Sequence, residues 1–516
     1  MVGRRRAVYR PGVCYGDHMS AAIRPTLLAA AAGVSLALAL PGPGLVPLIL
    51  LVPGLFGRAL AGARGWGAFR CGWIAGTAQW LVAVAWVVIV LHRYGHLVLP
   101  LAIFGLFVMA GILGLGWALV AWGVGRVPGS WRVWLLPLAL AAFEQIQHLP
   151  PWIFPWNPAA AVATAWPPLM APLPVLGTAG LSLVFYLAGS GLDALLDRSR
   201  RAAGALTLLA ASAVFVVGAV AAPPFHPTGA RERVAALQPN VPLEFRWDRD
   251  NLAAIQGRVE GLTAAAAAAG AGWVVWPESA VPRIVERDGA YRTGIEGLAR
   301  AHGVWLTVGS IGEGPGEGEY ANSVFQVSPG GVVPWRYDKV HLVPFGEYVP
   351  LAGQIGFLRP LVREVGSFTA GRSVLPLPSP VGPAGIAVCY EVAFPSLYAA
   401  EVRHGAEVLV TITNDGWYGD SAAPRQHLAL AMLRAAENRR FLIRAANTGI
   451  SAIIDPTGRL VASLEFGREG IVAGEVHGGT GQTPAARWGW LVAAGMPLCA
   501  VGAILIGTRR RESNPR

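Results

Sequence analysis

The chain has 516 residues, of which 54% are hydrophobic, and a formal net charge of +11 at pH 7. This apolar content exceeds that of an ordinary soluble protein, and it is concentrated before residue 222 and again at 487–507, which excludes a wholly soluble protein. Much of the positive charge is arginine in short loops between apolar runs, with no basic face carrying interleaved aromatics, so we expect no nucleic-acid partner.

Eight apolar runs are predicted to cross a membrane as helices, because a span needs about 20 mostly apolar residues. They lie at residues 22–40, 44–60, 71–91, 98–124, 133–148, 170–192, 203–222 and 487–507. Further spans follow the first run, so we interpret it as a membrane helix rather than a cleaved signal peptide.

These runs predict the domain order. We expect an N-terminal cytoplasmic tail (1–21), a seven-span membrane domain (22–222), an extracytoplasmic globular domain (223–477), a linker (478–486), an eighth span (487–507) and a cytoplasmic tail (508–516). The linker prediction rests on the flexible composition of Gly478–Gly481.

The arginines indicate which side of the membrane each predicted loop occupies. On one side of the predicted spans lie sixteen of them: Arg4, Arg5, Arg6, Arg10, Arg58, Arg64, Arg70, Arg126, Arg132, Arg198, Arg200, Arg201, Arg509, Arg510, Arg511 and Arg516. The opposite short loops carry only Arg93. Because positive loops stay in the cytoplasm, both termini are predicted there and the globular domain outside.

The loop after the fifth predicted span carries Trp152, Phe154, Trp156 and Trp166 on the outer side. Such residues suit an interfacial aromatic belt, and a lipid-entry gate is the alternative. Glu144, near the outer end of that span, is a functional candidate because intramembrane carboxylates are rare. So close to the interface, it could also simply reach water.

In the globular domain, strand-like and helix-like runs alternate, which is typical of a layered α/β domain. Strands are predicted at 233–238, 272–276, 304–308, 385–389, 408–412, 440–446, 450–455 and 459–465. Helices are predicted at 248–269, 291–302, 395–404 and 424–439, and a hairpin at 322–336.

Three residues of this domain could together perform acyl transfer. Cys389 is the single cysteine in the globular region, and a thiol needs a neighbouring base to become a useful nucleophile. Glu278, on a turn after a strand, could be that base, and the ammonium of Lys339 could stabilise an oxyanion. Taken separately, each residue is more readily explained in an ordinary way, as a buried cysteine or as a solvated surface charge.

The flanking sequences resemble the nitrilase (carbon–nitrogen hydrolase) superfamily. They are Trp276-Pro277-Glu278-Ser279, Tyr337-Asp338-Lys339-Val340 and Val388-Cys389-Tyr390-Glu391. Nearly the whole chain resembles the apolipoprotein N-acyltransferase family, the membrane-bound branch of that superfamily, most specifically at 343–350, 389–391, 413–420, 447–450 and 455–458. The resemblance implies a polytopic α-helical membrane domain of about eight spans plus a nitrilase-like αββα sandwich.

The resemblance also implies roles, residue by residue. Glu278 matches the general base, Lys339 the oxyanion stabiliser and Cys389 the nucleophile. Supporting positions are Glu347, Glu391, Tyr390 and Asn322, and predicted substrate contacts are Trp247, Trp417 and Glu144. No cofactor or metal is implied. The chain departs from the family pattern at Pro239, at Asn157-Pro158-Ala159 and in lacking an arginine after Glu144. The extension before Met19 lies outside the family plan, so translation could start at Met1 or Met19.

The implied reaction is ping-pong acyl transfer. A membrane phospholipid, usually phosphatidylethanolamine in this family, acylates Cys389, and the thioester then acylates the α-amino group of an apolipoprotein diacylglyceryl-cysteine. We expect a monomer in the bacterial cytoplasmic (inner) membrane. The main alternative is a membrane-tethered nitrilase-type amidase or hydrolase. A catalytically inactive lipid-binding chaperone and a transporter fit less well, because the triad is intact and the spans carry little charge.

Overall fold

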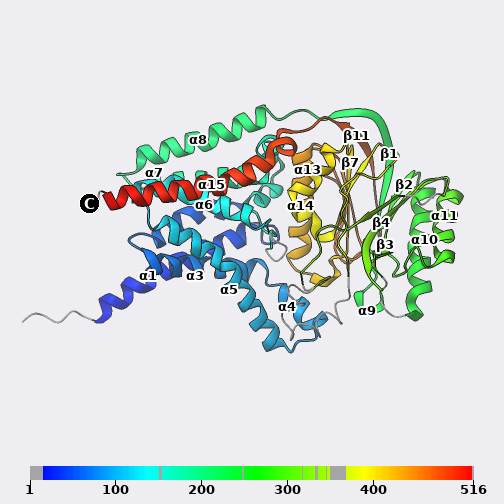
Figure 1. The fold of residues 1–516 in the computed structure, drawn as a ribbon, viewed down its shortest axis with the longest axis horizontal. Helices are drawn as coiled ribbons and strands as arrows, with labels where there is room; N and C mark the ends of the chain where they lie inside the picture. Colours follow the sequence, from blue (N-terminus) through cyan, green and yellow to red (C-terminus); the bar gives the residue numbers. More distant parts are fainter. Residues whose placement is uncertain are drawn as a thin grey trace, which may run out of the picture.

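A computed structural model describes residues 15–149, 154–246, 249–316, 318–331, 335–344, 346–348 and 368–513. These residues form a helical bundle beside an α/β sandwich (Figure 1). The chain's C-terminus lies at the end of the bundle that is remote from the sandwich.

The bundle contains the described residues before 221 and the last helix. Its helices are α1 (Tyr15–Ala39), α2 (Val52–Ala59), α3 (Gly65–Ala83), α4 (Val87–Ile89), α5 (Leu99–Val124), α6 (Arg132–Ile146), α7 (Leu173–Leu195), α8 (Arg201–Val220) and α15 (Pro484–Ser513). Short 3₁₀ or π turns join them: η1 (Val46–Leu51), η2 (Val90–Tyr94), η3 (Gly129–Trp131), η4 (Ala159–Ala165) and η5 (Pro167–Met170).

Long apolar helices are fewer than the eight predicted spans. Within the described residues, α5, α7, α8 and α15 are long and apolar enough to cross a membrane, and α3 with α4–η2 adds a fifth if that pair, bent by 65°, is one span. The predicted run at 44–60 is divided into η1 and α2, each beginning with a proline in its first turn. Proline begins helices readily but cannot donate a backbone hydrogen bond inside one.

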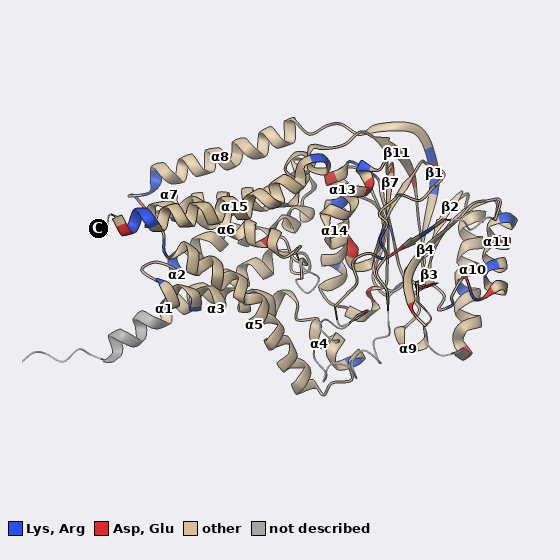
Figure 2. Ribbon diagram, in the orientation of Figure 1, with Lys and Arg blue, Asp and Glu red and all other residues tan. Residues whose placement is uncertain are grey.

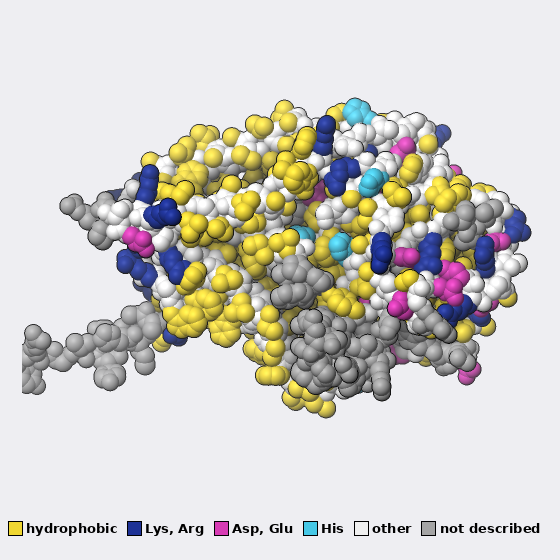
Figure 3. Space-filling model, viewed as in Figure 1, with side chains coloured by type: hydrophobic (Ala, Val, Ile, Leu, Met, Phe, Trp, Pro, Cys, Tyr) yellow, Lys and Arg dark blue, Asp and Glu magenta, His cyan; other side chains and the backbone are white. Residues whose placement is uncertain are grey.

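The face of the bundle seen in Figure 3 is largely apolar between its two ends. On α5, Phe104 and Leu119 are both 61% exposed, and on α15 Leu498 is 73% exposed. An exposed apolar surface of this kind marks contact with a membrane or a protein.

Arginines gather at the end of the bundle remote from the sandwich (Figure 2). There Arg58, in the last turn of α2, pairs with Asp193 of α7 at 2.8 Å. Arg132, at the start of α6, donates a hydrogen bond to the Leu60 carbonyl. The ends of α2, α6 and α7 therefore meet at this end of the bundle. We call it the arginine pole, after Arg58 and Arg132.

The opposite ends of the helices abut the sandwich. A side chain at Gly42, between α1 and η1, would collide with Ala422 of the sandwich. The Tyr94 hydroxyl at the end of η2 donates to the Gly416 carbonyl at 3.1 Å. The segment from Gly42 to Arg58 therefore runs from the sandwich to the arginine pole, although it is not one continuous helix.

The described part of the sandwich contains two sheets. The first has the order β11-β1-β2-β3-β4-β5, with β1 (His226–Gln238), β2 (Trp273–Val275), β3 (Trp305–Glu313), β4 (Tyr320–Val327), β5 (Trp335–Asp338) and β11 (Gly470–Thr480). The second has the order β10-β9-β8-β7-β6, with β6 (Ala384–Val388), β7 (Val408–Thr413), β8 (Leu442–Ala446), β9 (Ser451–Ile454) and β10 (Leu460–Leu464). Strands β1 to β3 pair in parallel, as do β6 to β8, so the ends of neighbouring strands bring their loops together.

Helices cover both outer faces of the sandwich (Figure 1). The first sheet carries α10 (Leu252–Ala268) and α11 (Gly289–His302), and the second carries α13 (Pro395–Arg403) and α14 (Ala423–Asn438), which lie against the bundle. Short turns complete the domain: α9 (Leu243–Arg246), η6 (Arg249–Asn251), η8 (Cys389–Ala393) and η9 (Asp415–Tyr418). Separate apolar cores fill the space between the sheets and under α10 and α11. The core under α13 and α14 is continuous with the bundle. The predicted αββα layering is therefore confirmed.

One prediction for this domain is wrong. Residues 478–480, assigned to a flexible linker, are the end of β11 and pair with β1, with Thr480 opposite His226. The two glycines are required by packing rather than by flexibility. A side chain would lie 2.2 Å from the Val381 carbonyl at Gly478 and 2.4 Å from the Phe225 ring at Gly479.

Candidate active site

Cys389 lies at the point where β6 ends and the 3₁₀ turn η8 begins. Its φ of +55° is in the left-handed region, which costs a non-glycine residue roughly 1–2 kcal/mol. The side chain is only 6% exposed. Strained backbone of this kind persists where the surroundings impose it and clusters at functional sites.

Lys339 follows β5 and its side chain is buried, with 1% exposed. Its ammonium lies 3.0 Å and 2.9 Å from the two carboxylate oxygens of Glu347 and 3.8 Å from Oε1 of Glu278. Burial alone would lower the pKa of Lys339, but the carboxylates of Glu347 and Glu278 raise it, and its net pKa is above the usual range. The lysine is therefore a buried, permanently charged ammonium.

Glu278 comes three residues after β2 and is buried beside the lysine. The Asn322 amide of β4 donates to Glu278 Oε1 at 2.7 Å and to Glu347 Oε1 at 2.9 Å, which fixes the two carboxylates relative to each other. The next residue, Ser279, has a φ of +42°. Strained backbone thus occurs on both sides of the site.

The thiol of Cys389 lies within the electrostatic influence of these groups. Burial raises its pKa above the usual range, the Glu278 carboxylate raises it further, and the Lys339 ammonium opposes them. The resting sulfur is therefore a protonated thiol, and a base must remove its proton before it can attack. The structure brings Glu278, Lys339 and Cys389 together, as the sequence predicted.

Glu391 connects the nucleophile turn to the lysine loop. One of its oxygens accepts hydrogen bonds from the backbone N–H groups of Val340 at 2.7 Å and His341 at 2.9 Å. The other accepts from Val388 N–H at 2.7 Å, and the Tyr337 hydroxyl lies 3.0 Å from both. Burial raises the pKa of Glu391 to about 7, and the N–H donors oppose that shift. Glu391 thus fixes the distance between the segments that carry Cys389 and Lys339.

Aromatic rings cover the bundle side of the site. Tyr390 stacks on Phe154 with centroids 6.0 Å apart and on Trp156 at 6.4 Å. Trp86, from the bundle, meets Tyr418 of η9 edge-on at 4.7 Å. The predicted interfacial tryptophan Trp156 is therefore buried against the sandwich rather than placed in a lipid-facing belt.

Of the two tryptophans predicted to contact substrate, the structure describes only one. Trp417 is 38% exposed at the junction of sandwich and bundle, with its ring 5.1 Å from that of Tyr94. Trp247 lies outside the described residues. Trp417 is therefore accessible near the site, and its contact with substrate stays a prediction.

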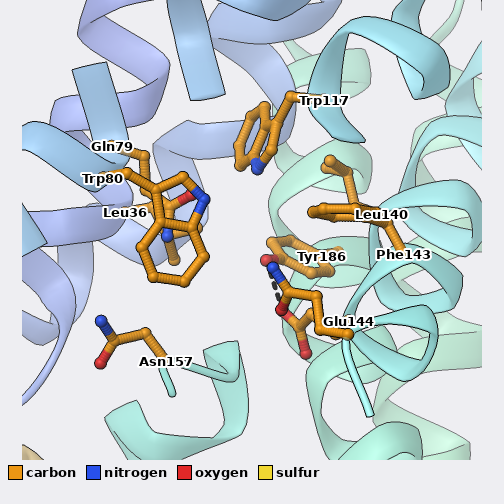
Figure 4. Close-up of a pocket in the computed structure, with 10 residues that line it drawn as sticks. Leu36, Gln79, Trp80, Trp117, Leu140, Phe143, Glu144, Asn157 and Tyr186 are labelled. Atoms are coloured by element: carbon orange, nitrogen blue, oxygen red, sulfur yellow. Dashed lines mark hydrogen bonds between the residues drawn. The ribbon is translucent and has the colours of Figure 1, made fainter. Parts of the chain in front are cut away.

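Glu144 lies in the bundle and not among the groups around Cys389 (Figure 4). It borders a small cavity lined by Leu36, Gln79, Trp80, Trp117, Leu140, Phe143, Gln147, Asn157 and Tyr186. One Glu144 oxygen accepts from the Tyr186 hydroxyl at 2.8 Å and from Ala159 N–H at 3.1 Å. The residue is 7% exposed, and the alternative that it reaches water stays untested. Its contact with substrate stays a prediction.

A buried polar network under Cys389 was not predicted. His427 of α14 contacts the Cys389 carbonyl, Asp415 and Arg444, and all three network side chains are fully buried. The helix 424–439 was predicted, but its polar residues gave no sign of which neighbours they would meet. In the structure α14 buries Gln426, His427 and Glu437, and buried polar groups require partners, but this burial cannot be seen in the sequence.

Comparisons with known proteins show which family the chain belongs to. The carbon-nitrogen hydrolase family model matches residues 233–485, and the apolipoprotein N-acyltransferase N-terminal domain model matches residues 32–191. The apolipoprotein N-acyltransferase of Geobacter metallireducens is 35% identical over 92% of this chain and 95% of its own. The chain belongs to the apolipoprotein N-acyltransferase family. That of Azotobacter vinelandii is 34% identical over 95% of this chain and 96% of its own.

The two family models divide this acyltransferase as the structure does. The hydrolase model spans the nitrilase-like sandwich, including Glu278, Lys339 and Cys389, and the N-terminal model spans the bundle from α1 into α7. Among the described residues, no group of three or more His, Cys, Asp or Glu side chains could hold a metal ion. The site brings together a thiol, an ammonium and carboxylates, which are groups that can take part in acyl transfer.

Proposed function

We propose that the protein transfers a fatty acyl chain from a membrane phospholipid, through a thioester on Cys389, to the α-amino group of an apolipoprotein's N-terminal diacylglyceryl-cysteine. The observation that carries this proposal is the position of Cys389. A buried ammonium–carboxylate cluster lies on one side of it, and an aromatic wall shared with the apolar bundle lies on the other. The first side suits acyl chemistry, and the second suits acyl chains.

In the first half-reaction, Glu278 accepts the Cys389 proton as sulfur attacks the donor's ester carbonyl. The Lys339 ammonium stabilises the tetrahedral oxyanion. As the intermediate collapses, the C–O bond breaks, the lysophospholipid oxygen takes the proton from Glu278, and a thioester remains. Glu347 holds Lys339 through both of its oxygens, so the ammonium is oriented before the substrate arrives.

In the second half-reaction, the acceptor amine attacks the thioester carbonyl. Lys339 again stabilises the oxyanion, and Glu278 takes the amine proton and returns it to the departing sulfur. An amide forms and Cys389 is regenerated as a thiol. The burial of Cys389 and Lys339 limits water access, and this favours transfer over hydrolysis of the thioester.

We propose eight passes through the bacterial inner membrane, with both termini cytoplasmic and the sandwich extracytoplasmic. The arginine pole supports this orientation, because positive residues favour the cytoplasmic side. For the broken second pass, six 3₁₀ residues and eight α residues span roughly 24 Å, close to the roughly 30 Å of the hydrocarbon core. The proposal includes the predicted domain boundaries, apart from those of the linker. It also includes phosphatidylethanolamine as the acyl donor and a monomeric enzyme.

A transfer assay tests the function. Purified protein is incubated with phosphatidylethanolamine and a synthetic peptide that begins with diacylglyceryl-cysteine, and mass spectrometry follows N-acylation of the peptide. We expect one acyl increment with the wild type and none with Cys389→Ala. Release of free fatty acid at the same rate with and without peptide, and no acylated peptide, would instead indicate the tethered hydrolase.

A further inference from the structure

The ring of His427 lies directly beneath the nucleophile turn. Its Nε2 is 3.0 Å from the backbone carbonyl oxygen of Cys389, and the contact is buried. A carbonyl oxygen can only accept, so Nε2 carries a proton and donates it. His427 therefore bonds to the backbone of the nucleophile and not to its sulfur.

Two buried groups fix the ring of His427. Its Nδ1 lies 2.8 Å from Asp415 Oδ1 and 3.2 Å from Arg444 Nη2. Arg444 also donates to Asp415 Oδ2 at 2.7 Å, and the Thr413 hydroxyl donates to Asp415 Oδ1 at 3.1 Å. These partners come from the end of β7, from η9 and from β8. The ring is thus anchored to the second sheet independently of the substrate.

The hydrogen bond from His427 is accepted by Cys389, the residue with the strained backbone. Cys389 has a φ of +55°, and rotation to the ordinary extended region would turn its carbonyl away from His427 and move its sulfur. A donor on that carbonyl stabilises the left-handed conformation relative to the extended one, because a buried carbonyl that loses its donor is costly.

We propose that His427 is a positioning residue for acyl transfer. By donating from Nε2 to the Cys389 carbonyl, it holds the nucleophile in the left-handed conformation that directs its sulfur toward the substrate ester. Asp415 and Arg444 hold the ring in place. The inference rests on the proposed function only in taking Cys389 as the nucleophile.

Two substitutions distinguish the contribution of Nε2 of His427 from that of Nδ1. The amide nitrogen of His427→Gln reaches the place of Nε2 and can still donate to Cys389, whereas that of His427→Asn reaches only the place of Nδ1. The measurement is the single-turnover rate of thioester formation from saturating phosphatidylethanolamine, followed by intact mass. We expect His427→Asn to be slower by about tenfold, the loss of one buried hydrogen bond. His427→Gln should stay within about threefold of the wild type. The lipid concentration giving half the maximal rate should be unchanged in both.

The thermal unfolding midpoint of each variant is the control for structural damage. If His427→Asn does not fold, His427→Met takes its place, because it has a similar volume and no donor. A wild-type rate in His427→Asn or His427→Met, neither of which can donate to the Cys389 carbonyl, would overturn the proposal. An equal loss of rate in His427→Gln and in these variants would overturn it as well. A wild-type protein that forms no thioester would contradict the proposed function itself, so the two failures are distinguishable.

Discussion

Two walls of opposite character face each other across Cys389. The sandwich wall is charged, with Lys339 between the carboxylates of Glu347 and Glu278 and with Asn322 bridging them. The bundle wall is aromatic, with Phe154 and Trp156 from the bundle stacked on Tyr390 of the nucleophile turn.

The difference indicates a division of tasks. Buried charges are tolerated only when they are paired and hydrogen-bonded, and here the pairing leaves an ammonium and a carboxylate beside a thiol. Aromatic surface provides apolar contact with defined geometry, which suits the chains of two lipid substrates. We therefore expect changes in the charged wall to slow the chemistry and changes in the aromatic wall to weaken binding.

The largest effect should follow removal of the base. Glu278→Gln keeps the size of the side chain but cannot accept the thiol proton, so thioester formation should slow by about 10²–10⁴-fold. The rate is measured as the single-turnover rate of thioester formation, followed by the mass of the intact protein. A variant with more than a third of the wild-type rate would contradict the assignment of Glu278 as the base.

Breaking the link between the two loops should have the next largest effect. In the wild type, backbone N–H groups donate to both oxygens of Glu391. Glu391→Gln replaces one of these oxygens with an NH₂ group, which cannot accept those hydrogen bonds. Leaving a buried donor unsatisfied costs about 1–3 kcal/mol, so we expect a slower acylation of about 10–100-fold together with a lower unfolding midpoint. As a matched control, Glu286→Gln alters a glutamate that pairs with Arg336 outside this cluster and should leave the acylation rate near that of the wild type.

The thiol's pH dependence should shift in opposite directions in two variants. Iodoacetamide alkylation of wild-type Cys389, located by peptide mass spectrometry, should still be rising above the ordinary thiol pKa of about 8.5. This is expected because burial and Glu278 raise the pKa of Cys389. Glu278→Gln removes a negative charge and should move the profile to lower pH. Lys339→Met removes the opposing positive charge and should move it to higher pH. Shifts in the same direction in both variants would contradict the charged-wall account.

The smallest effect is expected in the aromatic wall. Phe154→Leu removes the stack on Tyr390 but keeps an apolar side chain, so the half-saturating concentration of long-chain phospholipid should rise by about three- to tenfold. The maximal rate of thioester formation should change less than twofold. A large fall in maximal rate at unchanged half-saturation would show that the two walls do not divide their tasks in this way.

The sandwich could largely be predicted from the sequence because its buried strands are short apolar runs bounded by turns. The strands at 385–389 and 408–412 and the helix at 424–439 correspond closely to β6, β7 and α14. The last strand, β11, was not predicted, and its final residues were assigned to a linker because Gly478 and Gly479 suggest flexibility. Packing against Val381 and Phe225 explains these two glycines. In the bundle, composition located the apolar runs, but it could not show that prolines divide one of them.

The candidate site was predictable to the extent that it lies in recognisable sequence motifs. Glu278, Lys339 and Cys389 occur in such motifs and come together in the structure. His427 and Arg444 lie in a helix and a strand of ordinary composition, and their convergence on Asp415 depends on how α14 packs on the sheet. The left-handed backbone at Cys389 was likewise hidden, because the residue is not a glycine.

The most direct test of the central claim is the mass of the intact protein after incubation with phosphatidylethanolamine and no acceptor. The account predicts one fatty-acyl increment that hydroxylamine removes, that is absent in Cys389→Ala, and that disappears when a diacylglyceryl-cysteine peptide is added. Absence of any increment on the wild type, with phospholipid demonstrably bound, would contradict acyl transfer through Cys389.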